Sequence, residues 1–195
     1  KASRFIKDRS EIAWMSQDYN RYKELLESLE KNYPNDSKIA YRHGIISYCD
    51  GQMEQASNHL KKSMSMRKSP KNCTEALNAV DMINRHYPLA QRAIDSKDAE
   101  TAQTEIEACL SAGQKFCPAN SVLLSTVNNM KIKLIRLKHT PEEALEVLNQ
   151  MLNENSENVE LMLERGDVQL ELEDYDAALF DYQNAQRHRP NDRRA

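Results

Sequence analysis

The segment ERGDVQLELEDYDAALFDYQNAQRHRPND, from Glu164 to Asp192, has the residue order of two helices packed tightly against each other. Gly166 removes a side chain where the first helix approaches the second. Ala178 does the same from the facing side, and Tyr182 fills the space just beyond it. Pro190 ends the second helix, because a proline ring cannot adopt the helical i to i−4 geometry. The segment therefore predicts a helical hairpin.

This order of small residues, aromatics and proline is typical of a tetratricopeptide repeat. One such hairpin cannot bury its apolar face alone, so it predicts neighbouring repeats. Anchor residues equivalent to Ala178 recur along the chain at Tyr22, Ala56, Ala102 and Ala144. The two middle spacings exceed the roughly 34 residues of a regular repeat. We predict an all-α fold, a tetratricopeptide-repeat superhelix (an αα-hairpin solenoid) of about five helix pairs with lengthened helices in the middle.

We expect one array over residues 1–195, with the first long connection forming a helix and the second broken by a turn. Apolar side chains from Leu77 to Ile94 keep helical spacing, which favours a lengthened helix over a loop. The segment SAGQKFCPANS should extend a helix and then break at Pro118. The approximate repeats are 3–36, 37–70, 83–118, 125–158 and 159–192.

Composition excludes several classes of function. With 4 Gly and 6 Pro against 29% charged residues, helices are favoured over the many turns of a β-sandwich. A net charge of −3 gives no overall attraction to nucleic acid or anionic lipid, and no apolar run approaches membrane-spanning length. The sequence has no Gly-rich phosphate loop and no nucleophile beside a plausible base. We therefore expect no enzyme, no cofactor, no nucleic-acid partner and no membrane partner.

The cysteines favour neither a metal site nor a disulfide. Cys49, Cys73, Cys109 and Cys117 form no C-x-x-C pair, and no two histidines lie at ligand spacing beside them, so we expect no zinc or other metal site. Cys109 and Cys117 would lie roughly 12 Å apart along a continuous helix, too far for a disulfide unless that helix breaks. We expect buried thiols.

Partners of tetratricopeptide arrays bind in the groove lined by the first helix of each pair. The predicted partner-binding residues are Tyr41, Ile45, Tyr48, Tyr87, Leu163 and Asp167. Tyr41, Ile45 and Tyr48 lie at i, i+4 and i+7, so they form one apolar stripe. Some arrays hold a chaperone's terminal carboxylate with lysine, asparagine and arginine at fixed groove positions. Here those positions read Lys7 and Glu11, Tyr41 and Ile45, and Tyr87 and Gln91, so the complete clamp is absent. The alternative for Tyr41 and Tyr48 is packing between helices.

Three segments together resemble a known family. They are SMRKSPKNCTEALNAV, HTPEEALEVLNQMLNENSENVELMLERGD and YDAALFDYQNAQRHRPND. They resemble the repeat region of the J-domain co-chaperones, most closely the endoplasmic-reticulum member that is also described as a protein kinase inhibitor. In that family a J domain with a His-Pro-Asp motif follows the repeats and stimulates an Hsp70-class ATPase. This sequence contains no such tripeptide, so we expect a fragment with the J domain outside it.

The resemblance implies a co-chaperone module that captures unfolded or misfolded polypeptides for an Hsp70 partner, reached through the J domain outside this chain. The alternative is an adaptor scaffold that binds one folded partner, such as a kinase domain, through a charged surface. We expect a monomer in the lumen of the endoplasmic reticulum, with the cytoplasm as the alternative. Two glycosylation sequons, at Asn35 and Asn72, are meaningful only in a secreted context.

Overall fold

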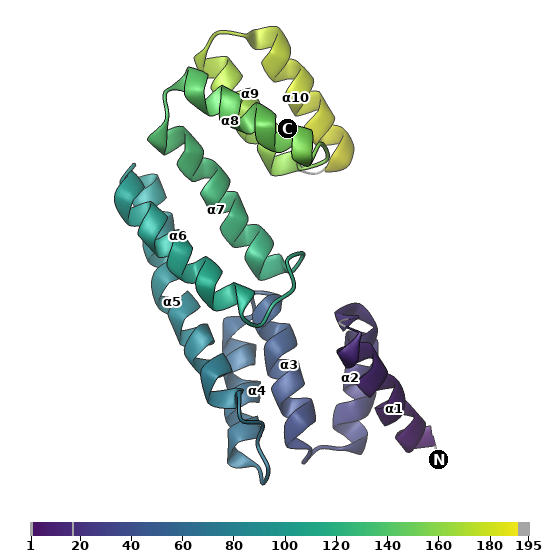
Figure 1. Cartoon of the computed structure of the whole chain (residues 1–195). Coiled ribbons are helices and arrows are strands. Elements are labelled where there is room, and N and C mark those ends of the chain that lie inside the picture. Colours follow the sequence, from purple (N-terminus) through teal and green to yellow (C-terminus); the bar gives the residue numbers. More distant parts are fainter. Residues whose placement is uncertain (1, 17, 191–195) are drawn as a thin grey trace. The chain divides into compact units, whose positions relative to one another are not determined.

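The computed structural model describes residues 2–16 and 18–190, and over these residues the fold is all-α (Figure 1). The prediction of a helical solenoid is confirmed. The last two residues of the final predicted repeat, 191 and 192, lie outside the described residues. The helices are α1 (Ala2–Met15), α2 (Tyr19–Asn32), α3 (Ser37–Cys49), α4 (Met53–Ser65), α5 (Cys73–Asp95), α6 (Ala99–Gln114), α7 (Val122–Lys138), α8 (Pro141–Glu154), α9 (Val159–Glu171) and α10 (Tyr175–His188).

The helices belong to two compact units. The first unit comprises residues 1–87 and 107–127, and the second comprises residues 88–106 and 128–195. Within the first unit α1 pairs with α2, α3 pairs with α4, and α2 packs on α3; within the second, α9 pairs with α10 and α8 packs on α9. The predicted lengthened helix is α5, which has 23 residues and continues through Pro88. The predicted break at Pro118 is also present, since α6 ends at Gln114 and α7 begins at Val122.

A left-handed residue precedes the second helix in three of the hairpins. These residues are Gly51, Lys97 and Glu173, with φ angles of 79°, 59° and 62°. Each turn is followed by a helix that carries one of the predicted anchors. All five anchors are at most 1% exposed: Tyr22, Ala56, Ala102, Ala144 and Ala178. A small or fully enclosed side chain at this point allows the paired helices to approach closely, as the sequence pattern required.

The two small residues that the sequence placed at helix contacts do lie there. A Cβ atom built on Gly44 would be 2.7 Å from Leu60 Cγ, and one built on Gly166 would be 2.9 Å from Tyr182 Cε1. Neither distance is possible for a real side chain without movement of the neighbour. Glycine is therefore required at both contacts by the closeness of the paired helices.

Each unit has its own apolar core. In the first unit, buried residues of α1, α2 and α3 form a cluster that includes Tyr22, Leu29 and Ile46. In the second unit, a cluster from α7 to α10 includes Leu148 and Leu163. Hydrophobic burial of this kind is the main stabilising contribution, at roughly 25 cal/mol for each Å² removed from water.

A buried arginine joins α1 to α3. Arg42 has an 8% exposed side chain and forms two hydrogen bonds to Glu11, of 2.9 and 2.7 Å. Its guanidinium lies 5.0 Å from the Trp14 ring centroid and 5.7 Å from that of Tyr22. This bidentate, ring-flanked geometry is available to arginine and not to lysine. It connects the first helix pair to the second.

The expectation of four thiols was wrong for two of the cysteines. Cys49 and Cys117 form a disulfide with a Cα–Cα distance of 5.4 Å, whereas Cys73 and Cys109 are buried thiols as expected. The partner of Cys117 is 68 residues away in sequence, and only the fold brings the loop after α6 to the end of α3.

In the described part of the chain, none of the helices combines the length and the apolar character needed to cross a bilayer.

Candidate functional site

A cleft of about 330 Å³ opens in the first unit beside the disulfide. Its floor includes Ile45, Ile46 and Cys49 from α3, and its rim includes Lys23 from α2 and Asp50 at the end of α3. The opposite wall is the turn before α7: Pro118, Asn120, Ser121 and Val122. A cleft with an aliphatic floor and a polar rim suits an apolar side chain flanked by a polar backbone.

The disulfide holds the wall of this cleft in place. Cys117 immediately precedes Pro118, and its bond to Cys49 ties the turn to the last residue of α3. Ser121 is buried and its Oγ accepts a hydrogen bond from the Leu124 amide at 3.3 Å, which starts α7. Val122 follows and is 57% exposed. The cleft therefore has an exposed aliphatic side chain on a wall that is covalently anchored.

The rim of the cleft carries paired charges. Lys23 Nζ lies 2.6 Å from the Asp50 carboxylate, with side chains 38% and 27% exposed. Asp18, which caps α2 by accepting a hydrogen bond from the Arg21 amide, also lines the cleft. The rim thus offers both donors and acceptors for a bound polypeptide backbone.

The predicted apolar stripe on α3 does not form a continuous surface. Ile45 is 3% exposed and Tyr48 is fully buried, with the Tyr48 ring in edge contact with Phe116 at a centroid distance of 6.4 Å. Tyr48 is therefore a core residue, which corrects its assignment to the groove. The reason is the turn after α6, which covers this face of α3. Ile45 borders the cleft, and Tyr41 is half-buried.

Tyr87 is half-buried on α5 and lines neither the cleft of the first unit nor the groove described below. A binding role for Tyr41 and Tyr87 remains a prediction.

The second unit contains a charged groove of about 570 Å³ between the end of α5, α7 and α9. Arg136 lies at its centre and contacts three carboxylates of α9: Glu164 at 3.2 Å, Asp167 at 2.8 Å, and Glu171. Lys97 and Lys133 also line the groove. The arrangement can recognise a charged surface through electrostatic complementarity.

Burial raises the pKa of two groups in this network, Glu164 and Tyr182. Burial raises the pKa of Glu164, whose side chain is 4% exposed, and Arg136 partly offsets that effect. The Tyr182 hydroxyl donates a hydrogen bond of 2.7 Å to Asp167. Burial, together with this bond to Asp167, raises the pKa of Tyr182. Asp167 is therefore held by two donors and joins α7, α9 and α10.

The two predicted groove residues of α9 have different places. Asp167 lines the groove, with a 39% exposed side chain. Leu163 is 1% exposed in the apolar core, so its assignment to the groove is corrected. Its face of α9 packs inside the second unit, whereas the neighbouring face, with Glu164 and Asp167, turns to Arg136. The two predicted residues therefore lie on different faces of α9, and a binding role for Asp167 stays a prediction.

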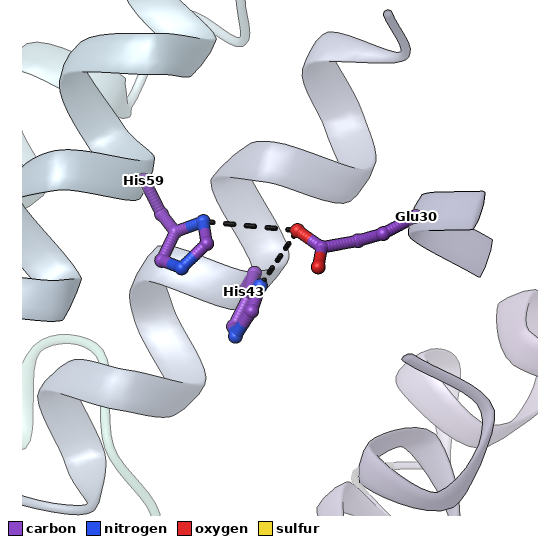
Figure 2. Close-up of side chains that lie close together, drawn as sticks. All are labelled: Glu30, His43 and His59. Carbon is purple, nitrogen blue, oxygen red and sulfur yellow. Dashed lines mark hydrogen bonds and ion pairs between the residues drawn. The ribbon is translucent and has the colours of Figure 1, made fainter. Parts of the chain in front are cut away.

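A third cluster was not anticipated from the sequence. Glu30 of α2, His43 of α3 and His59 of α4 converge, with their ligand atoms within 4.8 Å of one another (Figure 2). A signal for it exists in the sequence, because His43 precedes Gly44 and His59 precedes Leu60. The close contact of Gly44 with Leu60 brings the two histidines together.

Comparison with known proteins places these features in context. No protein-family model matches the chain. The chain is 25% identical over 162 residues to a Dictyostelium discoideum protein named DnaJ homolog subfamily C member 3 homolog. That match covers 83% of this chain and 32% of the relative, so the chain spans about a third of the relative's length.

Among solved structures, the chain is similar to the crystal structure of the P58(IPK) TPR domain. The match covers 99% of this chain and 62% of the P58(IPK) chain, with a TM-score of 0.47 and 16% sequence identity. The sequence similarity to a protein named as a DnaJ homolog supports a co-chaperone or protein-interaction role for this helical-repeat chain.

Proposed function

We propose that this chain is the client-binding repeat module of a J-domain co-chaperone of the endoplasmic reticulum, and that it captures unfolded polypeptides for an Hsp70 partner. The observation that carries the proposal is the similarity to a DnaJ homolog over 83% of the chain. The Hsp70 partner would be engaged through a J domain outside these residues. The module itself would act as a monomer and would catalyse no reaction.

The cleft of the first unit is the proposed client site. An extended client segment would place an apolar side chain against Val122 and over Ile45, while its backbone meets the polar rim at Lys23 and Asp50. Covering an aliphatic side chain in such a site contributes roughly 1.5–3 kcal/mol at full burial. Binding through one side chain and the backbone is weak and tolerant of sequence, as capture of unfolded chains requires.

The luminal location is proposed from the cysteines. Disulfides persist in oxidising compartments and are rare in the cytosol, so the Cys49–Cys117 pair supports the endoplasmic reticulum over the cytoplasm. Asn35 and Asn72 lie at exposed positions, where an oligosaccharide could be attached. Glycosidase sensitivity of the protein expressed in its own cells, lost in the Asn35→Gln, Asn72→Gln double variant, would support a luminal site. A reduced Cys49 in freshly lysed cells would count against it.

The test of client capture uses Val122→Asp, because Val122 is exposed and its replacement leaves the core intact. Affinity for a reduced, permanently unfolded polypeptide should fall at least about tenfold, which corresponds to 1.4 kcal/mol. The matched control is Met64→Asp, an exposed apolar residue of α4 that is outside the cleft. Equal binding by the wild type and the Val122→Asp variant would contradict the proposed site.

The second candidate function is an adaptor that binds one folded partner, such as a kinase domain. The observation that favours it is the charged groove around Arg136 in the second unit. Binding through this groove should be saturable with one partner per chain and should weaken as salt screens the charges. Lys133→Glu would then reduce the association rate, whereas Val122→Asp would have no effect.

A further inference from the structure

Two histidine rings stack in the first unit and face one carboxylate. The ring centroids of His43 and His59 are 3.6 Å apart and their planes meet at 28°. His43 Nδ1 lies 2.9 Å from Glu30 Oε1, and His59 Nδ1 lies 3.8 Å from the same oxygen. Figure 2 shows that both Nδ1 atoms point toward this oxygen and that the other ring nitrogens point away.

One ring nitrogen of this cluster, on His59, is left without a hydrogen bond. His59 Nδ1 is buried and makes no hydrogen bond in the structure. Only one of the two histidines is within hydrogen-bond distance of Glu30. A buried polar atom without a partner is destabilising, so the arrangement favours a ligand that satisfies both rings at once.

The equivalent positions of the last hairpin hold two oppositely charged side chains. Arg165 precedes Gly166 as His43 precedes Gly44, and Asp181 precedes Tyr182 as His59 precedes Leu60. Arg165 and Asp181 form a two-bond salt bridge of 2.7 and 2.6 Å, and Arg165 also bonds Asn149 of the preceding helix at 2.8 Å. Opposite charges therefore join the helices there.

In the hairpin of α3 and α4, both of these positions hold an imidazole, on His43 and His59. Two imidazoles cannot form the salt bridge that Arg165 and Asp181 form, and a carboxylate of the preceding helix, Glu30, faces both of them. A divalent cation between the three side chains would supply the missing opposite charge. Imidazole nitrogens with one carboxylate oxygen are a donor set that zinc and its first-row neighbours accept.

We propose that Glu30, His43 and His59 form a binding site for a divalent transition-metal ion, best suited to zinc, that links α2 to the α3–α4 hairpin. Neighbouring ligand atoms of tetrahedral zinc with bonds of about 2.0–2.1 Å are about 3.3 Å apart. The two nitrogen-to-oxygen distances of 2.9 and 3.8 Å lie on either side of that value. Three protein ligands leave the fourth position to water.

The hydrogen bonding of the cluster fits this ligand set. His59 Nδ1 makes no hydrogen bond in the structure, so this nitrogen is available to a metal ion. His43 Nδ1 lies 2.9 Å from Glu30 Oε1, and a metal ion bound by both atoms would replace that one hydrogen bond with two coordinate bonds.

The experiment is calorimetric titration of the metal-free full chain with zinc chloride. We expect one site per chain and a melting midpoint raised by about 5–10 °C at 100-fold excess over the Kd. Calcium and magnesium, which prefer all-oxygen sites, should not bind. Cobalt should give the strong visible absorption of a tetrahedral site.

The variants His43→Gln and His59→Gln should each weaken zinc binding at least about tenfold while helix content is unchanged. His139→Gln is the matched control, because His139 also lies 3.7 Å from a carboxylate, that of Glu143, without a second histidine. Absence of saturable zinc binding to the wild type would overturn the site. Unchanged affinity in both cluster variants would also overturn it, since binding would then belong to another group such as the Cys73 thiol.

Discussion

Gly166 on α9 lies directly against the ring of Tyr182 on α10, so close that a Cβ atom at position 166 would be 2.9 Å from Tyr182 Cε1. This contact is the reason for the sequence order of the last hairpin. Tyr182 is also fixed by its hydrogen bond to Asp167, so its ring has little freedom to withdraw.

Gly166→Leu should therefore destabilise the protein by about 1–3 kcal/mol, because the larger side chain overpacks the helix pair. Chemical unfolding followed by circular dichroism measures the change. Gln183→Leu, at an exposed position of α10, should remain within about 0.5 kcal/mol of the wild type. An unchanged transition midpoint for Gly166→Leu would contradict the tight contact.

Removal of the disulfide should loosen the first unit. The Cys49→Ser, Cys117→Ser double variant opens a loop with a sequence separation of 68 residues, which should cost about 2–4 kcal/mol. Reduction of the wild type should have a similar effect on the melting midpoint and no effect on the double variant. A Cys73→Ser variant, which leaves the disulfide intact, should keep its sensitivity to reductant.

Acid should weaken the contact between α1 and α3. The hydrogen bonds from Arg42 lower the pKa of Glu11, so the stabilisation is complete above the unfolded-state pKa near 4.3 and is lost as the pH falls through the folded-state pKa. Glu11→Gln should cost about 1–3 kcal/mol at pH 7, because it leaves Arg42 partly buried beside a neutral group.

Urea titrations repeated at falling pH should show that the difference in free energy of unfolding between the wild type and Glu11→Gln becomes steadily smaller. Asp8→Asn, on the same helix and exposed, is the control and should show no such trend. If this difference in free energy of unfolding stays constant as the pH falls from 7, the stabilising contact of Arg42 does not require a charged Glu11.

Arg136→Met should destabilise the second unit by about 2–3 kcal/mol at pH 7, because it leaves the carboxylate of Glu164 buried without its cation. Burial already raises the pKa of Glu164, and loss of Arg136 should raise it further. The variant should consequently recover stability as the pH falls and Glu164 takes up a proton. Lys133→Met, in the same groove, is the comparison variant: Lys133 also lowers the pKa of Glu164, but less than Arg136 does, so both effects should be smaller.

Ile45→Asp should unfold the first unit, since Ile45 is 3% exposed and a charge there would lose most of its hydration. The loss should appear as a lower helix content and a lower melting midpoint. Val122→Asp, at the 57% exposed position across the cleft, should leave both unchanged. A stable Ile45→Asp variant would show that the cleft is wider and wetter than the structure describes.

The sequence by itself determined the helices, their pairing and the contacts that close each pair. Gly44, Gly166 and the anchor alanines specify these features because helix pairing is local: its signals lie within one hairpin, at the 3.6-residue period. The long α5 and the break at Pro118 were predictable for the same reason. Asp167, a predicted partner-binding residue, lines the charged groove of the second unit, and its binding role stays a prediction.

Only the tertiary structure decided which side chains are buried and which residues from different helices lie close together. Tyr48 and Leu163 are apolar residues on first helices, and nothing local reveals that packing inside their units covers them. The Cys49–Cys117 disulfide and the Glu30, His43 and His59 cluster join residues from different helices. Their distances depend on how hairpins stack, which a periodic pattern along one helix does not encode.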